Sequence, residues 1–284
     1  VSFARPHSPY DPPQRYLDMY KDVQVPEPVI GEWAASFANY PKKKDAAFGD
    51  YGVEHAVESR RHYYANITFI DDQIGQVIQA LKDKGLYDDA VIIFVSDHGD
   101  MLGDHYHWRK TYPYEGSTHV PFLLRLPEWM KMAVEPGAHL SYPVELRDIL
   151  PTFLDAAGAE VPEGMDGASV LPLVQSKKPQ WREYIDLEHA TCYSANNYWC
   201  ALTDGKMKYV WGFHDGKEQL FDMTKDPGEK VNLAGNKKYR KALELWRGRM
   251  VAHLSERGEE YVKDGQLQVL KKTRLYSPHY PEGE

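Results

Sequence analysis

The sequence has few cysteines, no long apolar run and no excess of positive charge. Cys192 and Cys200 are the only cysteines among 284 residues, and two cysteines do not decide the redox compartment. They flank a predicted turn, where they either pair across a hairpin or stay free. No apolar stretch is long enough to span a bilayer. The net charge of -8 argues against a nucleic-acid partner, but it leaves an anionic small substrate open because a local cationic pocket can override it.

The composition is that of a globular protein with a substantial core. Hydrophobic residues make up 42% of the chain and aromatic residues 13%. The length suits one large domain or a large and a small one. No initiator Met and no secretory leader is visible, and Val1-Ser2-Phe3 is interpreted as the end of a buried strand. We therefore expect that the chain does not begin at a natural start.

The most informative stretch begins with the apolar run 91–95 and breaks into polar residues at Ser96. A short, β-branched, unalternating run predicts a strand that is buried on both faces. Asp97 and His98 follow its carboxyl end, where α/β folds bind their ligands. A carboxylate beside an imidazole is a reasonable pair of metal ligands, although the two side chains could instead cap a turn.

The loop that follows is rich in titratable groups and leads into a second apolar run at 120–126. Lys110 is a compact cation that can reach an anionic oxygen, unless it is simply an exposed loop lysine. His105 could orient the loop, contact a substrate or cap a turn; we include it as a candidate substrate-binding residue. His7 lies between Pro6 and Pro9, which hold it in an extended loop, and its imidazole suits acid–base chemistry.

Periodicity predicts the remaining elements. Helical patterns cover 55–84 and 144–157, and Pro151 implies a kink or a late start in the second. After about residue 176 come short strands and a final helix, with Asp-Gly hairpin signals at 204–205 and 215–216. These predicted elements are the strands 184–189, 198–203, 207–213 and 219–222 and the helix 237–257. We predict an α/β domain over 1–176 and a smaller α+β subdomain, an antiparallel sheet with a helix, over 177–284. Four aromatic residues of this subdomain are either core or a substrate rim: His189, Tyr193, Trp199 and Trp211.

Four linked motifs carry a resemblance to a known family. They are Ser96-Asp97-His98-Gly99, Leu102-Gly103-Asp104-His105, Trp108-Arg109-Lys110 and Thr118-His119-Val120-Pro121. In this order and spacing they resemble the type I sulfatases of the alkaline phosphatase superfamily. Pro6-His7-Ser8-Pro9 resembles the Pro-His-x-Pro of that family, and Asp226-Pro227-Gly228-Glu229 its Asp-Pro-x-Glu. The resemblance implies an alkaline-phosphatase-like sheet flanked by helices.

The resemblance also implies roles for the candidate residues. His7 would contact the sulfate and protonate the leaving oxygen, and Lys110 would bridge the sulfate and the leaving-group oxygen. Asp97 and His98 would hold one divalent ion, calcium in most relatives. His98 stands where many members have Asn, so a variant ligand set is implied. The substrate would be a sulfated small molecule or saccharide, and the compartment periplasmic, secreted or lysosomal in type.

The family's nucleophile is a formylglycine made from a Cys/Ser-x-Pro/Ala-x-Arg motif, and no such motif occurs in this sequence. The paired aspartates that complete the metal site and an upstream Lys-x-His are also missing. All of these belong to the N-terminal half of a sulfatase. We therefore expect that the missing half is a partner, and that this chain alone lacks the nucleophile and half of the metal ligands.

Three functions compete. The first is hydrolysis of aryl or carbohydrate sulfate esters, and the second is hydrolysis of phosphonate monoesters or phosphodiesters by a member of the same superfamily. The third is a catalytically inactive scaffold fragment. The Pro-His-x-Pro loop and the C-terminal hairpins favour the sulfatase, whereas the absence of the nucleophile favours an inactive fragment. A two-zinc phosphodiesterase is disfavoured, because no second His/Asp set with suitable spacing follows residue 121.

Overall fold

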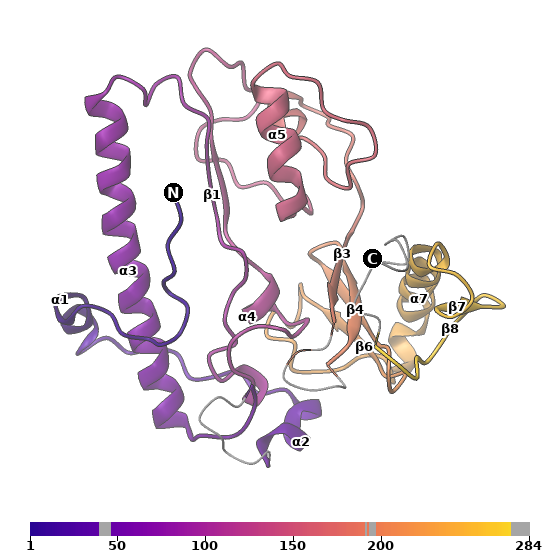
Figure 1. Cartoon of the computed structure of the whole chain (residues 1–284). Coiled ribbons are helices and arrows are strands. Elements are labelled where there is room, and N and C mark those ends of the chain that lie inside the picture. The colour runs from indigo at the N-terminus through magenta and orange to yellow at the C-terminus, as the bar shows by residue number, and fades with distance from the viewer. Residues whose placement is uncertain (40–46, 191, 193–196, 274–284) are drawn as a thin grey trace, which may run out of the picture.

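The computed structural model describes residues 1–39, 47–190, 192 and 197–273 (Figure 1). The chain mixes helices with antiparallel sheets, in agreement with the predicted α/β class. The helices are α1 (Gln14–Leu17), α2 (Ala35–Ala38), α3 (Val53–Asp83), α4 (Glu115–Thr118), α5 (Ile149–Ala156), α6 (Leu171–Gln175) and α7 (Arg240–Ser255). The strands are β1 (Ile92–Val95), β2 (Phe122–Arg125), β3 (Ile185–His189), β4 (Trp199–Thr203), β5 (Met207–Gly212), β6 (Glu218–Asp222), β7 (Val262–Lys263) and β8 (Gln266–Leu267). Short 3-10 turns accompany them at Asp18–Tyr20, Glu32–Ala34, Asp104–Tyr106, Leu146–Asp148 and Lys237–Tyr239.

The long helix α3 supports the loop that follows β1. The N-terminal segment runs between α3 and the β1–β2 ribbon (Figure 1). Arg60 of α3 is buried, and its Nε donates to the Leu102 carbonyl at 3.0 Å. Its Nη2 also lies 2.5 Å from a carboxylate oxygen of Asp104, which accepts from Val29 N at 2.6 Å. Through these contacts the helix fixes a turn of the segment 96–121 between β1 and β2, which we call the site loop.

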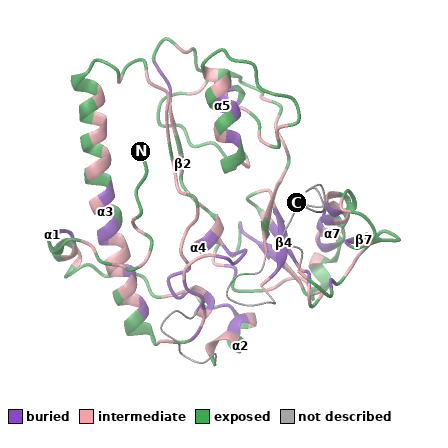
Figure 2. Cartoon of the chain, viewed as in Figure 1, coloured by how far each residue is buried: buried purple, intermediate pink, exposed green. Residues whose placement is uncertain are grey.

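Strands β1 and β2 correct one expectation. The two strands pair antiparallel, with Ile92 opposite Arg125 and Val95 opposite Phe122. The apolar run predicted a strand buried on both faces, but its residues are only partly covered and Phe94 is exposed. The reason is that β1 has a single hydrogen-bonded neighbour within the described chain. Figure 2 shows this ribbon mostly in the intermediate and exposed colours.

The main core lies between α7 and the sheet β3-β4-β5-β6. Every predicted strand of this sheet is present, and all neighbours pair antiparallel. Helix α7 contributes Leu243, Trp246, Met250 and Leu254 to the core. These residues recur at helical spacing, so one face of α7 covers the sheet. Figure 2 shows the buried colour concentrated around β4 and on this face of α7.

The remaining elements follow local sequence rules. The helix predicted over 144–157 starts late, since a 3-10 turn at Leu146–Asp148 precedes α5 and places Pro151 in its first turn. Val1 is exposed and no strand forms at Val1–Phe3, which corrects the interpretation of this segment as a strand end. Cys192 and Cys200 are both free. No helix in the described ranges has the length and apolarity to cross a membrane.

Candidate active site

Just after β1, the backbone of the site loop at Gly99 packs very closely against the backbone of residues 116–117. The Gly99 N–H donates to the Ser117 carbonyl at 2.8 Å. A Cβ atom at this position would lie only 2.1 Å from the backbone oxygen of Gly116, which no side chain can tolerate. Glycine is therefore required here because two backbone segments touch. This contact brings the residues after β1 against the start of α4.

Asp97 and His98 lie side by side at the end of β1, as predicted. His98 Nδ1 lies 2.8 Å from the Gly99 carbonyl, which can only accept, so this nitrogen carries the proton. The lone pair of the neutral ring is then on Nε2, which is 3.8 Å from Oδ2 of the exposed Asp97 carboxylate. Two ligands of one ion at about 2.0–2.6 Å from it can be this far apart, so the pair fits part of a divalent-cation site. No cluster of three or more His, Cys, Asp or Glu residues with metal-binding geometry occurs in the described part of the chain.

His7 and Lys110 meet at the same place although 103 positions separate them. Lys110 Nζ lies 3.0 Å from His7 Nε2. His7 Nδ1 donates to the Ser8 carbonyl at 2.8 Å, so Nε2 of the neutral ring is free to accept from the lysine. The ring centroids of His7 and His98 are 5.6 Å apart in an edge arrangement. The structure thus brings four of the five predicted site residues, His7, Asp97, His98 and Lys110, into one exposed cluster.

Asp100 joins the His7 segment to the Lys110 segment. Its Oδ2 accepts from the Tyr10 hydroxyl at 2.7 Å, and its Oδ1 accepts from the backbone N–H of Leu102 and Arg109 at 3.0 and 2.9 Å. Burial of Tyr10, together with the negative charge of Asp100, raises the pKa of that phenol and keeps it a donor. Asp100 was not among the predicted site residues. Its position directly after Asp-His-Gly was the signal that could have identified it.

His105, the fifth predicted site residue, lies apart from this cluster. Its side chain is 2% exposed, and Nδ1 accepts from Gly31 N at 2.9 Å. The ring packs against Trp33 and Tyr114 at centroid distances of 4.7 and 5.4 Å. Burial lowers the pKa of His105 to about 4, so the ring is neutral. Its position therefore does not support contact with a substrate; it fits the alternative in which His105 orients the loop.

His107 is a second buried, neutral histidine of the loop. It is fully buried, and burial lowers its pKa to about 3. Its Nδ1 donates to the His105 carbonyl at 2.7 Å, while Nε2 has no partner among the described residues. The ring lies 4.0 Å from Tyr112 and 4.4 Å from Phe37, measured between centroids. His107 thus belongs to the aromatic packing under the loop.

A buried ion cluster fastens α4 to the C-terminal sheet. Lys208 Nζ of β5 is 2.6 Å from a carboxylate oxygen of Glu115 and 2.8 Å from one of Glu229, and its side chain is 1% exposed. Burial opposes the ionisation of Glu115, but the hydrogen bond from His119 and the charge of Lys208 outweigh it and lower the pKa to about 2. Burial also raises the pKa of Glu229, which Lys208 only partly offsets. His119, predicted to be structural, is exposed and pairs with Glu115 at 2.7 Å.

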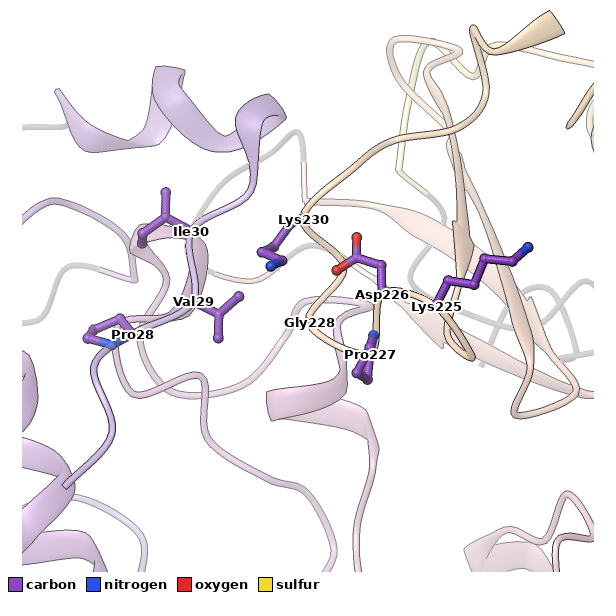
Figure 3. A pocket seen from close by; sticks show the side chains of 8 residues that line it. All are labelled: Pro28, Val29, Ile30, Lys225, Asp226, Pro227, Gly228 and Lys230. Carbon is purple, nitrogen blue, oxygen red and sulfur yellow. The ribbon is translucent and has the colours of Figure 1, made fainter. Parts of the chain in front are cut away.

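A separate pocket of about 430 Å³ lies where the segment 28–30 meets the Asp-Pro-Gly-Glu turn (Figure 3). None of the predicted site residues lines it. Its lining residues are Pro28, Val29, Ile30, Lys225, Asp226, Pro227, Gly228 and Lys230. Because the reacting groups of the loop are absent from its walls, this pocket is not the candidate active site.

The aromatic residues of the C-terminal hairpins fit the core alternative better than a substrate rim. Trp199 and Trp211 are both buried, and His189 stacks on Trp199 with centroids 5.9 Å apart. Tyr193 lies outside the described residues. Trp199 is nevertheless close to the site loop, since its Nε1 donates to the Thr111 carbonyl at 3.0 Å.

Comparison with known proteins places this geometry in context. The sulfatase profile matches residues 1–159, and a profile described as N-sulphoglucosamine sulphohydrolase, C-terminal, matches residues 103–256. An arylsulfatase of Clostridium perfringens is 38% identical over 269 residues, which cover 94% of this chain and 55% of that protein. A choline-sulfatase of Rhizobium meliloti is 36% identical over 83% of this chain and 46% of its own length. The chain thus spans about half the length of these curated relatives.

The chain is also similar in fold to solved structures of related enzymes. A phosphonate monoester hydrolase of Agrobacterium radiobacter has a TM-score of 0.75 and 28% identity, over 90% of this chain and 56% of that one. A protein solved in complex with its substrate D-glucosamine-2-N,6-O-disulfate has a TM-score of 0.60 and 25% identity, over 71% of this chain and 41% of that one. The sulfatase profile covers more than half of the chain, and the polar cluster lies within the matched range. The chain belongs to the sulfatase family, whose members use a metal ion and a formylglycine.

Proposed function

We propose that this chain is the later part of a sulfatase that hydrolyses sulfate monoesters of an aryl group or a saccharide. The observation that carries the proposal is the 3.0 Å approach of Lys110 Nζ to His7 Nε2 beside the Asp97–His98 pair. At this exposed place Lys110 supplies a cation for an anionic ester, and His7 supplies a group that can carry a proton. The Asp97–His98 pair supplies two types of metal ligand. The names of the arylsulfatase and choline-sulfatase relatives, and the disulfated glucosamine bound by a structural neighbour, support a sulfated substrate.

In the proposed reaction the S–O bond to the leaving group breaks and water supplies the oxygen that replaces it. Lys110 neutralises a sulfate oxygen and the charge that develops on the leaving oxygen. Protonated at Nε2, His7 gives that proton to the leaving oxygen as the bond breaks. Asp97 and His98 would hold one divalent ion, calcium by family resemblance, which supplies further neutralisation of the sulfate. The nucleophile, a formylglycine, and the other metal ligands would come from an N-terminal half of the enzyme.

A second candidate is a phosphonate monoester hydrolase of the same superfamily. The TM-score of 0.75 with the Agrobacterium radiobacter enzyme, over 90% of this chain, favours it specifically. Both reactions require a cation and a proton donor at the leaving oxygen, so the residues in this half serve either one. The sulfatase is preferred because the curated relatives with 38% and 36% identity carry sulfatase names.

The test is intact and peptide mass spectrometry of the natural protein that carries this chain, followed by assays with aryl sulfate and aryl phosphonate esters. We expect an aldehyde-bearing residue outside residues 1–284 and faster turnover of the sulfate ester. Faster turnover of the phosphonate would replace the first candidate by the second. An intact protein with no aldehyde and no turnover of either ester would establish an inactive scaffold.

A further inference from the structure

Lys110 lies between two residues with left-handed backbone conformations. Arg109 has φ of 65° and Thr111 has φ of 89°. For a β-branched residue such as threonine this region is strongly disfavoured, and it persists only where surrounding contacts impose it. The direction in which the Lys110 side chain leaves the loop depends on both of these torsions. The contacts that hold Arg109 and Thr111 therefore decide whether Lys110 reaches His7.

The Arg109 side of the lysine is held from within the site loop. The Arg109 N–H donates to Asp100 Oδ1 at 2.9 Å, and its carbonyl accepts from Met101 N at 2.7 Å. These contacts form a closed turn of the loop itself. They do not reach the peptide that follows Lys110.

The Thr111 side is held from the C-terminal sheet. Asn197 Nδ2 donates to the Thr111 carbonyl at 3.0 Å and to its Oγ1 at 2.9 Å. Trp199 Nε1 donates to the same carbonyl at 3.0 Å and to Asn197 Oδ1 at 3.1 Å. A carbonyl only accepts and an indole N–H only donates, so the Asn197 amide has one possible orientation. Thr111 thus accepts hydrogen bonds at both its backbone oxygen and its side-chain oxygen, and these bonds fix its backbone torsions.

We propose that Asn197 and Trp199 are positioning residues for Lys110, which act by holding Thr111 in its left-handed conformation. Trp199 is buried at the start of β4, so its position is fixed by the C-terminal sheet. The side chains of Asn197 and Trp199 in turn fix Thr111, the residue that follows Lys110. The proposal deepens the proposed function and rests on it for the catalytic use of Lys110. It gives the C-terminal sheet a role in catalysis without contact to the substrate.

The test compares four variants in the natural protein that carries this chain. Asn197→Ala removes the hydrogen bonds from Asn197 to Thr111. We expect kcat/KM for the preferred ester to fall about tenfold, because a displacement of a catalytic group by an ångström or less already slows the reaction. Adding Thr111→Gly should restore much of this loss, since glycine adopts a φ near 89° without strain. Adding Asn197→Ala to Lys110→Ala should cause no further loss, because the two act through one group.

Asn232→Ala is the matched control. Asn232 lies in the same C-terminal region and accepts from Leu220 N at 3.1 Å, and its hydrogen bonds within the described residues do not involve Thr111. We expect this variant to lower the melting temperature as much as Asn197→Ala does while kcat/KM stays unchanged. A loss in Asn197→Ala that Thr111→Gly does not restore, or that persists in the Lys110→Ala background, would overturn the proposal.

A crystal structure of the Asn197→Ala variant keeps the proposal testable if neither ester is hydrolysed. We expect the separation between Lys110 Nζ and His7 Nε2, which is 3.0 Å in the unaltered chain, to increase and the φ of Thr111 to leave its value of 89°. An unchanged separation and torsion would refute the positioning role, whatever reaction the protein performs. Retained activity in Lys110→Ala would instead refute the proposed function alone.

Discussion

The site loop and the C-terminal sheet obtain their shapes in opposite ways. Among the described residues, five of the seven non-glycine residues with positive φ lie between positions 102 and 111: Leu102, His105, Tyr106, Arg109 and Thr111. Strands β3–β6 contain none, and several of their core residues are wholly buried. A strained backbone costs on the order of 1–3 kcal/mol per residue and needs contacts that impose it. Apolar burial, by contrast, stabilises the sheet directly.

Because of this contrast, substitutions in the loop and in the sheet should change different properties of the protein. The loop depends on polar contacts from outside it, which come from Arg60 of α3 and from Asn197 and Trp199 of the sheet region. Loss of such a contact should change the position of a reacting group more than the stability of the whole chain. Loss of a buried group in the sheet should lower the stability of the whole chain more than it moves a reacting group.

Lys208→Met should destabilise the chain most. The substitution leaves Glu115 and Glu229 without their shared cation, and Glu229 is almost completely buried. Removal of one partner from a buried ion cluster costs about 3–5 kcal/mol. Urea unfolding measures it, with the exposed Lys206→Met as the control. Equal stability of the two variants would show that the cluster does not hold the sheet to α4.

Lys110→Ala should lower kcat by about a hundredfold to a thousandfold, the usual loss when one electrostatic group is removed from the transition state. The melting temperature should barely change, because the lysine is only partly buried on a loop. Steady-state kinetics with the preferred ester measure the effect, and Lys178→Ala on an exposed turn is the control. A large stability loss with little change in kcat would break the proposed division between loop and sheet.

Acid should destabilise the chain through His107. Its folded pKa of about 3 lies below the ordinary value of 6.5, so only the unfolded chain takes up the proton as pH falls from neutrality. The stability is therefore fully present above pH 6.5 and is lost as pH falls toward 3, by on the order of 3 kcal/mol at pH 4. His105, with a pKa of about 4, acts in the same direction.

Unfolding free energies of His107→Phe between pH 7 and pH 4 measure this term. The variant should show a flatter pH dependence than the unaltered chain, whereas the exposed His139→Phe should not. An unchanged slope in His107→Phe would mean that other groups cause the acid sensitivity.

Asp100→Ala should destabilise the chain by about 1–3 kcal/mol, less than Lys208→Met, because it leaves three donors without an acceptor. Those donors are the Tyr10 hydroxyl and the backbone N–H of Leu102 and Arg109. We expect a larger relative loss in kcat/KM, since the His7 and Lys110 segments are no longer joined. Asp100→Asn, which retains an acceptor oxygen, should recover part of both losses. Full activity of Asp100→Ala would exclude this link.

Local patterns were sufficient for the regular elements. The helix over 53–83 and the four strands of the C-terminal sheet appear close to their predicted bounds, because side-chain period and turn chemistry act over a few residues. The resemblance to sulfatases selected His7, Asp97, His98 and Lys110, which the fold gathers into one cluster. The division of the chain at residue 176 stays a prediction.

Sequence patterns alone were enough to predict most of the regular elements, the family and the chemical types of the candidate site residues. They could not reveal that His105 is buried, or that Asn197 reaches Thr111 across 86 positions. Nor could they show that β1 pairs only with β2 in an antiparallel ribbon within the described residues. These features depend on which segments meet in space. Burial, backbone strain and hydrogen bonds between distant residues arise only from tertiary packing, and they decide where the Lys110 side chain lies.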